Sequence, residues 1–165
     1  MTALPKILTQ FANPSSIKQV WGVLKSVPGG GRMMGRLIGR MAPYTGSIRP
    51  EVVSLDLGYA KIRIRDRKAV RNHLNSVHAC ALINLGEATT GVAMMMAMPE
   101  DMRGIPIHLA MDYLKKSRGT ITCECSCIAP ASGERKEYEV VGELKDESGD
   151  IVAKVFARWM VGPAR

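Results

Sequence analysis

Several features that define common protein classes are missing from this sequence of 165 residues. Residues 1–14 lack the continuous apolar core and the small-residue cleavage site of a signal peptide. The most apolar stretch, residues 77–98, is interrupted by polar side chains such as Asn84 and Glu87, which are costly in a bilayer. We therefore expect a soluble cytoplasmic protein, long enough to bury a core without metal or disulfide cross-links.

Cysteine is also scarce, with four residues in the whole chain. Cys123, Cys125 and Cys127 alternate with other residues, so on a strand they share one face. Zinc sites commonly need two to four residues between paired ligands, and no second pair is present. We expect reduced cysteines in the core and no metal site.

Acidic residues are absent from the first 50 positions, where all seven charged side chains are basic: Lys6, Lys18, Lys25, Arg32, Arg36, Arg40 and Arg49. This asymmetry indicates either a solvated helical face or an anionic partner, such as phosphates, an acidic carrier protein or an anionic membrane surface that residues 1–48 contact. The segment holds few aromatic residues and no nucleic-acid-binding motif, so we expect no nucleic-acid partner.

The periodicity of apolar residues divides the chain into two parts. Residues 1–48 have helical spacing, with apolar positions at Ile7, Leu8 and Phe11 and a break at residues 28–31. From residue 51 the period is two, except for one long apolar helix over about residues 76–98, with Ser76 as its N-cap. This pattern predicts an α+β fold in which an antiparallel sheet wraps around one long central helix. We expect residues 1–48 to form an N-terminal helical extension of the domain over residues 49–165.

Glu87 is the one fully charged residue between Arg71 and Glu100. Burying a carboxylate is costly unless it is hydrogen-bonded, so Glu87 either anchors a buried polar network or is retained for chemistry. Its neighbours on the helix form a stripe of small or polar residues that we assign to substrate binding: Cys80, Asn84, Gly91 and Met94. The methionines of residues 94–98 either line an acyl pocket or belong to the ordinary core.

The start of this helix offers a second chemical group. Its first amides have no partner within the helix and attract negative charge, so those near Ala79 and Cys80 are candidates for an oxyanion hole. His78 is either a helix-capping or core residue or a catalytic one. It lies nine residues from Glu87, about 180° around the helix, so the two side chains cannot share one face.

These residues form a motif, Asn72-x5-His78-Ala79-Cys80-x6-Glu87. The motif resembles the Asn-x5-His-Gly-Gly-x6-Asp/Glu signature of hotdog-fold acyl-CoA thioesterases of the phenylacetyl-CoA thioesterase type. It is most similar to a thioesterase-like branch with Glu at the acid position. The resemblance implies that Glu87 is the nucleophile or general base, that the Ala79 amide polarises the thioester carbonyl, and that Asn72 positions the carbonyl or the attacking water.

Ala79 and Glu87 are separated by about 12 Å along a straight helix, too far for both to contact one carbonyl. If both act on one substrate, they come from two copies of the chain. The resemblance likewise implies a dimer or a dimer of dimers with interface sites, acting on acyl-CoA or an acyl-carrier protein without another cofactor.

A non-catalytic protein that binds or senses acyl thioesters is the alternative, favoured by Ala79 and Cys80 in place of the two glycines. A peripheral membrane protein is a third hypothesis. For the phosphates of CoA the candidate contacts are Lys115, Lys116 and Arg118.

Overall fold

The computed structural model describes residues 14–128, 130, 133 and 135–164. In chain order its elements are α2 (Pro14–Leu24), α3 (Gly30–Met41), α4 (Pro43–Ser47), β1 (Glu51–Asp56), β2 (Tyr59–Ile64), the 3-10 helix η1 (Lys68–Val70), α5 (Ala79–Ala97), β3 (Met102–Tyr113), β4 (Ile121–Ser126), β5 (Lys136–Lys145) and β6 (Ile151–Pro163). The predicted helical positions Ile7, Leu8 and Phe11 lie outside the described residues.

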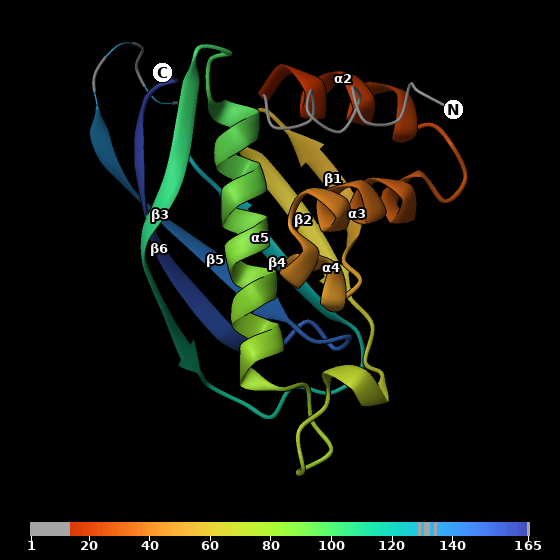
Figure 1. The fold of residues 1–165 in the computed structure, drawn as a ribbon. Helices are drawn as coiled ribbons and strands as arrows, with labels where there is room; N and C mark the ends of the chain where they lie inside the picture. Colours follow the sequence, from red (N-terminus) through yellow and green to blue (C-terminus); the bar gives the residue numbers. More distant parts are fainter. Residues whose placement is uncertain (1–13, 129, 131–132, 134, 165) are drawn as a thin grey trace.

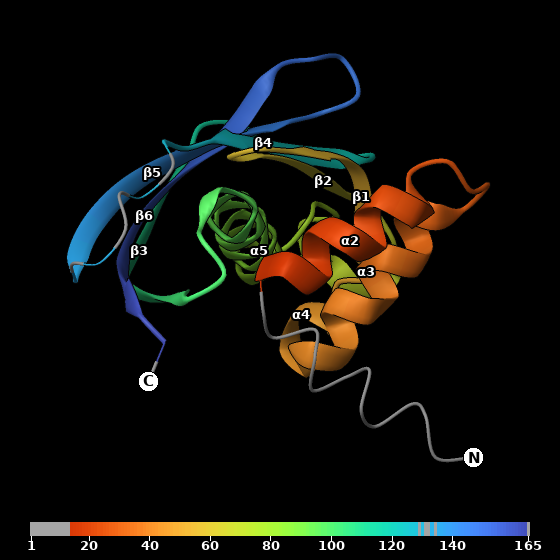
Figure 2. The same cartoon turned by 90° about the horizontal axis from the view of Figure 1, so that it is seen from above.

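The six strands form one antiparallel sheet in the order β1-β2-β4-β5-β6-β3. The sheet curves around α5, which lies along its concave face (Figures 1 and 2). This confirms the predicted α+β fold, in which an antiparallel sheet wraps around one long central helix. In β4 alternate side chains point toward the helix, and Cys123 and Cys125 are buried there as predicted.

The central helix is shorter than predicted, because it begins at Ala79 and has His78 rather than Ser76 as its N-cap. The Ser76 hydroxyl instead donates a hydrogen bond to Asn72 Oδ1 in the preceding loop. Among the described residues α5 is the one helix with the length and hydropathy of a membrane span, but 67% of that window is buried inside the protein, as in the core helix of a folded domain.

Small residues let the sheet approach α5 closely. A Cβ atom added at Gly86 would lie 2.8 Å from the Val155 side chain of β6, which is too close for ordinary contact. The absent side chain therefore lets the helix lie close to β6.

The N-terminal helices pack beside α5 and over the β1 end of the sheet (Figure 2). Ile17 and Met34 belong to the same hydrophobic core as the sheet and α5. Two hydrogen bonds tie α2 to that core, from Trp21 Nε1 to the Leu55 carbonyl at 3.1 Å and from Lys18 Nζ to the Met98 carbonyl at 3.0 Å. The described helices α2 and α3 are thus part of the packed unit.

The two edges of the sheet differ. α3 packs against β1, whereas β3 pairs only with β6 within the described chain. Apolar side chains are exposed along β3 and just after it, with Ile105 at 52%, Ile107 at 43% and Leu114 at 58% exposure. A 12-residue edge strand with one edge unpaired and apolar side chains exposed is a ready partner for another strand.

Candidate functional site

The loop before α5 is organised by Asn72. Its Oδ1 accepts hydrogen bonds from the backbone amide of Leu74 at 2.9 Å and from the amide and hydroxyl of Ser76, both at 3.2 Å. Asn75 adopts a positive φ of 56°, a conformation that asparagine tolerates better than most residues. Asn72 therefore shapes the loop, and its proposed contact with a substrate carbonyl or a water stays a prediction.

His78 caps the first turn of α5. Its Nδ1 accepts a hydrogen bond from the Cys80 amide at 3.0 Å, and its carbonyl accepts from the amides of Ala81 and Leu82. The Cys80 amide is thus occupied. Of the two amides predicted for an oxyanion hole, the Ala79 N–H is the one without an acceptor among the described residues, and it lies at the exposed, positive end of the helix dipole.

Glu87 lies halfway along α5 and is half-buried. Its carboxylate forms no hydrogen bond or ion pair with any residue that the structure describes, and burial raises its pKa above the ordinary value. Cys80, Ile83 and Glu87 are not buried and lie three and four residues apart. They form one open stripe along the first half of the helix.

A cavity of about 290 Å³ lies between the start of α5, α4 and the end of η1. His78, Cys80 and Asn84 line it together, which brings three predicted site residues to one place. Asn84 Nδ2 donates to the Tyr44 carbonyl at 3.2 Å, while its Oδ1 is buried without a described partner. Asn84 therefore keeps a free acceptor in this region.

Gly91 and Met94 lie elsewhere. A Cβ atom at Gly91 would lie 2.9 Å from Cη2 of Trp159, and Met94 is fully buried in the core. In the single chain neither residue lines the described cavities. Met96 and Met98 are likewise buried in the core, as the core alternative for this cluster requires, and its role in an acyl pocket stays a prediction.

The family described as a domain of unknown function, DUF4442, matches residues 30–161, which is most of the chain. The chain belongs to the DUF4442 family. A search of curated proteins found no match to it.

Solved structures place the DUF4442 chain in the hotdog fold. It is similar to a structural-genomics protein at 26% identity, with a TM-score of 0.76 over 90% of this chain and 98% of the other. It is also similar to a Pseudomonas aeruginosa protein of unknown function described as a probable thioesterase, at 20% identity and a TM-score of 0.70, covering 84% and 97% of the two chains. A thioesterase family protein from Silicibacter pomeroyi matches at 13% identity and a TM-score of 0.67, covering 81% and 100%. The predicted hotdog fold is confirmed.

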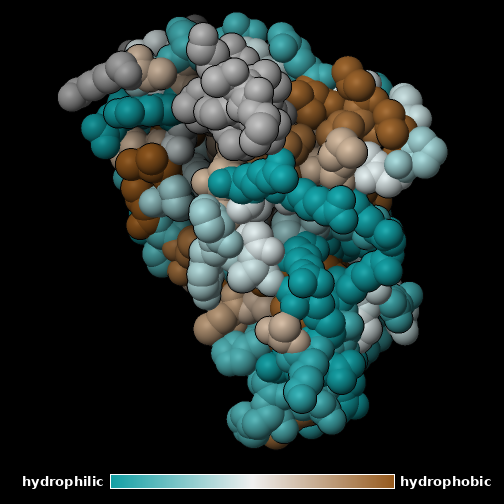
Figure 3. Space-filling view, turned by 45° about the vertical axis from the view of Figure 1, so that its right-hand side comes forward, coloured by the Kyte–Doolittle hydropathy of each residue, from teal (hydrophilic) through white to brown (hydrophobic). Residues whose placement is uncertain are grey.

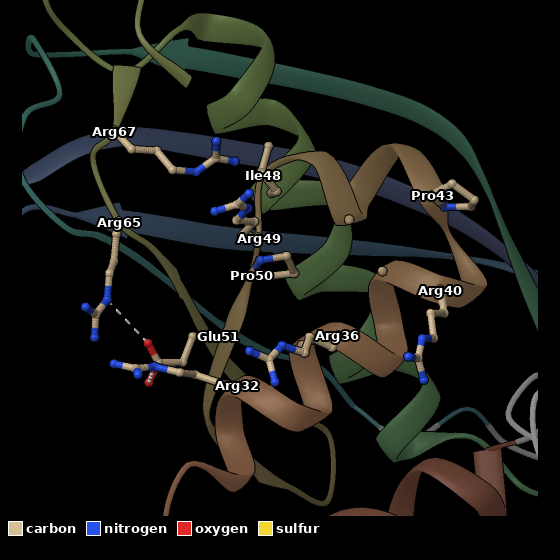
Figure 4. Close-up of a pocket in the computed structure, with 13 residues that line it drawn as sticks. Arg32, Arg36, Arg40, Pro43, Ile48, Arg49, Pro50, Glu51, Arg65 and Arg67 are labelled. Atoms are coloured by element: carbon tan, nitrogen blue, oxygen red, sulfur yellow. Dashed lines mark ion pairs between the residues drawn. The ribbon is translucent and has the colours of Figure 1, made fainter. Parts of the chain in front are cut away.

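The basic first third of the DUF4442 chain, predicted to be either a solvated face or a contact for an anionic partner, contributes to a cavity that the sequence did not indicate. Of the predicted phosphate contacts, Lys115 is instead engaged by Asp146 at 3.1 Å and by Asp150. Arginines gather in a larger cavity beside α3 and α4, drawn in Figure 4. The sequence feature that could have indicated this cavity is a Gly-Arg pair repeated every four residues, at Gly31-Arg32, Gly35-Arg36 and Gly39-Arg40.

Proposed function

We propose that this protein hydrolyses acyl thioesters at a site formed by two copies of the chain, as a dimer or a dimer of dimers. Glu87 of one copy and the Ala79 amide of the other would act on the same carbonyl. The observation that carries the proposal is the Glu87 carboxylate, half-buried on the open stripe of α5 and without a partner among the described residues.

The Ala79 amide supplies the electrostatic part of the reaction. Charge develops on the carbonyl oxygen in the transition state, and a fixed N–H donor at a helix N-terminus stabilises it. The cap made by His78 leaves this amide free while it occupies the next one. His78 is thus a positioning residue for the helix start.

Glu87 supplies the proton transfer. In its ionised form the carboxylate accepts a proton from a water molecule, and the resulting hydroxide oxygen forms a bond to the thioester carbon. The tetrahedral oxyanion accepts a hydrogen bond from the Ala79 amide. The carbon–sulfur bond then breaks, the thiolate takes the proton from Glu87, and the products are a carboxylic acid and a thiol. Burial strengthens Glu87 as a base, because its raised pKa lies closer to neutral pH.

The single chain cannot bring the two groups together, since eight residues of helix separate them by about 12 Å. The exposed edge of β3 supports a second copy as the missing component. Pairing two β3 strands about a two-fold axis would bury Ile105 and Ile107 and continue the sheet. The Tyr113 hydroxyl donates to the Ala79 carbonyl at 3.3 Å, so the end of β3 lies at the start of α5. The thioesterase names of proteins with the same fold also support the proposal.

The test is turnover of a panel of acyl-CoAs by wild type, by Glu87→Gln and by Glu100→Gln as a control at an exposed acid beyond the helix. Loss of the base is expected to lower kcat by about 100-fold or more, with acyl-CoA binding retained. Glu100→Gln should match wild type. Binding by a wild-type protein that hydrolyses no member of the panel would overturn hydrolysis in favour of the binding or sensing alternative.

A further inference from the structure

The largest cavity described in this structure, about 830 Å³, lies between α3, α4 and the segments that flank β1 and β2. Its charged lining consists of one acid, Glu51, and six arginines: Arg32, Arg36, Arg40, Arg49, Arg65 and Arg67. The formal net charge of this arginine cavity is therefore +5. Figure 3 shows hydrophilic side chains across the face that carries α3 and α4, and Figure 4 shows the arginines approaching from three segments of the chain.

Backbone packing of α3 builds the arginine cavity. A Cβ atom at Gly35 would lie 1.8 Å from the Pro50 carbonyl oxygen, and one at Gly39 would lie 2.7 Å from the Gly46 Cα atom. Glycines at these positions let the helix lie directly against the chain before β1 and against α4. Each glycine is followed by an arginine, so Arg36 and Arg40 are carried along the rim one helical turn apart, with Cβ atoms about 6 Å from each other.

Glu51 balances only part of this charge. Its carboxylate is shared by Arg32 at 3.6 Å, Arg65 at 3.8 Å and Arg63 at 2.9 Å. These arginines hold the pKa of Glu51 below its ordinary value. Three others, Arg36, Arg40 and Arg49, form no ion pair with any described acid.

Arg67 is the most confined of the six. One of its terminal nitrogens donates to the Ser47 carbonyl, but its Nε is buried without a partner in the described chain. Burial and the nearby charge of Arg49 lower the pKa of Arg67. Like charges held close together repel one another, and an anion between them would lower that free energy.

We infer that the arginine cavity binds a small organic group that carries two or more phosphates. Guanidinium groups match phosphate oxygens in paired hydrogen bonds, and several arginines spread over successive helical turns suit more than one phosphate. The volume is that of a small-molecule site, and its concave shape favours a compact ligand over an extended macromolecular surface.

Two sources of such phosphates exist: the nucleotide part of a CoA thioester and the headgroup of an anionic lipid. The structure favours the nucleotide, because Ile48 lines both the arginine cavity and the smaller cavity at the start of α5. A ligand held by its phosphates in the first can extend its other end toward His78 and Cys80 in the second. This part of the inference rests on the proposed function.

The experiment measures equilibrium binding of adenosine 3',5'-bisphosphate and CoA by calorimetry, and binding of phosphatidylcholine vesicles with and without cardiolipin by sedimentation. Wild type is compared with Arg36→Gln/Arg40→Gln. The control is Arg135→Gln/Lys136→Gln, which removes the same charge from exposed positions at the start of β5. Both pairs are exposed, and thermal unfolding checks that each variant folds.

The cavity variant is expected to bind its ligand about tenfold or more weakly, while the control changes less than about twofold. If wild type binds the nucleotides and the cavity variant loses this binding, CoA is the source of the phosphates. If wild type binds cardiolipin vesicles but no nucleotide, and the cavity variant loses vesicle binding, the lipid is the source. The inference is overturned if wild type binds none of the probes, or if the two variants lose affinity equally.

Turnover separates this inference from the proposed function. Hydrolysis of an acyl-N-acetylcysteamine thioester, which carries no phosphate, should be unchanged in Arg36→Gln/Arg40→Gln, whereas KM for the matching acyl-CoA should rise about tenfold. If Arg36→Gln/Arg40→Gln hydrolyses both thioesters with unchanged kcat and KM, the proposed hydrolysis stands. The assignment of the arginine cavity to the phosphates of CoA is then refuted.

Discussion

The two edge strands of the sheet have opposite surroundings. β1 lies against α3, a helix whose glycines permit backbone contact, and α2 is tied to the same edge by Trp21. β3 is twice as long, 12 residues against 6, and exposes apolar side chains with no covering element in the described chain. One edge is thus completed within the chain, and the other is suited to completion by a second copy.

The largest effect is expected from breaking the covered edge. Gly35→Ala would place a methyl group against the Pro50 carbonyl, and we expect a loss of about 3 kcal/mol in the free energy of unfolding, measured by urea denaturation. Gly22→Ala in α2 is the matched control, because a Cβ there meets nothing within 4 Å. It should stabilise the protein by up to about 1 kcal/mol. Equal behaviour of the two variants would contradict the packing described for α3.

The second effect tests the uncovered edge. Ile107→Glu introduces a charge on β3 and is expected to weaken self-association by about 2 kcal/mol, a roughly thirtyfold increase in the dimer dissociation constant, measured by sedimentation velocity. Ile128→Glu, at a position 85% exposed, should leave the oligomeric state unchanged. A wild-type protein that remains monomeric at high concentration would remove the proposed role of β3.

A smaller effect concerns the tie between α2 and β1. Trp21→Phe removes the hydrogen bond to the Leu55 carbonyl and is expected to cost about 1 kcal/mol more than Trp159→Phe. Trp159 is the comparison because its indole nitrogen is buried without a described partner. The measurement is the difference in free energy of unfolding between the two variants, and no difference would mean that the Trp21 bond contributes nothing.

The smallest effect is the pH dependence of Glu87. Its pKa is raised in the folded protein, so the folded state holds the proton more tightly than the unfolded state. Ionisation of Glu87 therefore lowers the free energy of unfolding as pH rises from the unfolded-state pKa, about 4.3, through the raised folded-state pKa. Glu87→Gln should melt at a higher temperature than wild type near pH 8 and at the same temperature near pH 3. A constant difference across this range would show that Glu87 titrates normally.

The architecture was predictable because periodicity is a local property. Alternation of apolar residues along residues 59–66 and 120–128 predicts strands, which the structure has at Tyr59–Ile64 and Ile121–Ser126. The one long apolar stretch predicts the central helix. The predicted helix start at Ser76 is wrong. Serine is ordinarily a better N-cap than histidine, but the Ser76 hydroxyl is hydrogen-bonded to Asn72 and does not cap the helix.

Parts of the candidate site were beyond sequence reasoning because they depend on contacts between distant segments. The stripe of small residues predicts a substrate-binding role for Gly91, whereas in the structure its lack of a side chain makes room for Trp159 of β6. The basic character of α3 was evident, but its meeting with Arg49 and Arg67 follows from how the helix lies on the chain before β1. The motif around Glu87 was accessible because its residues are close in sequence.

The four cysteines differ in a way that has a practical consequence. Burial raises the pKa of Cys123 to about 12 and that of Cys127 to about 11, so neither forms appreciable thiolate at neutral pH. Cys80 is free and exposed in the first turn of α5. A maleimide fluorophore would therefore attach there first, and its emission would report directly on what enters the space beside His78.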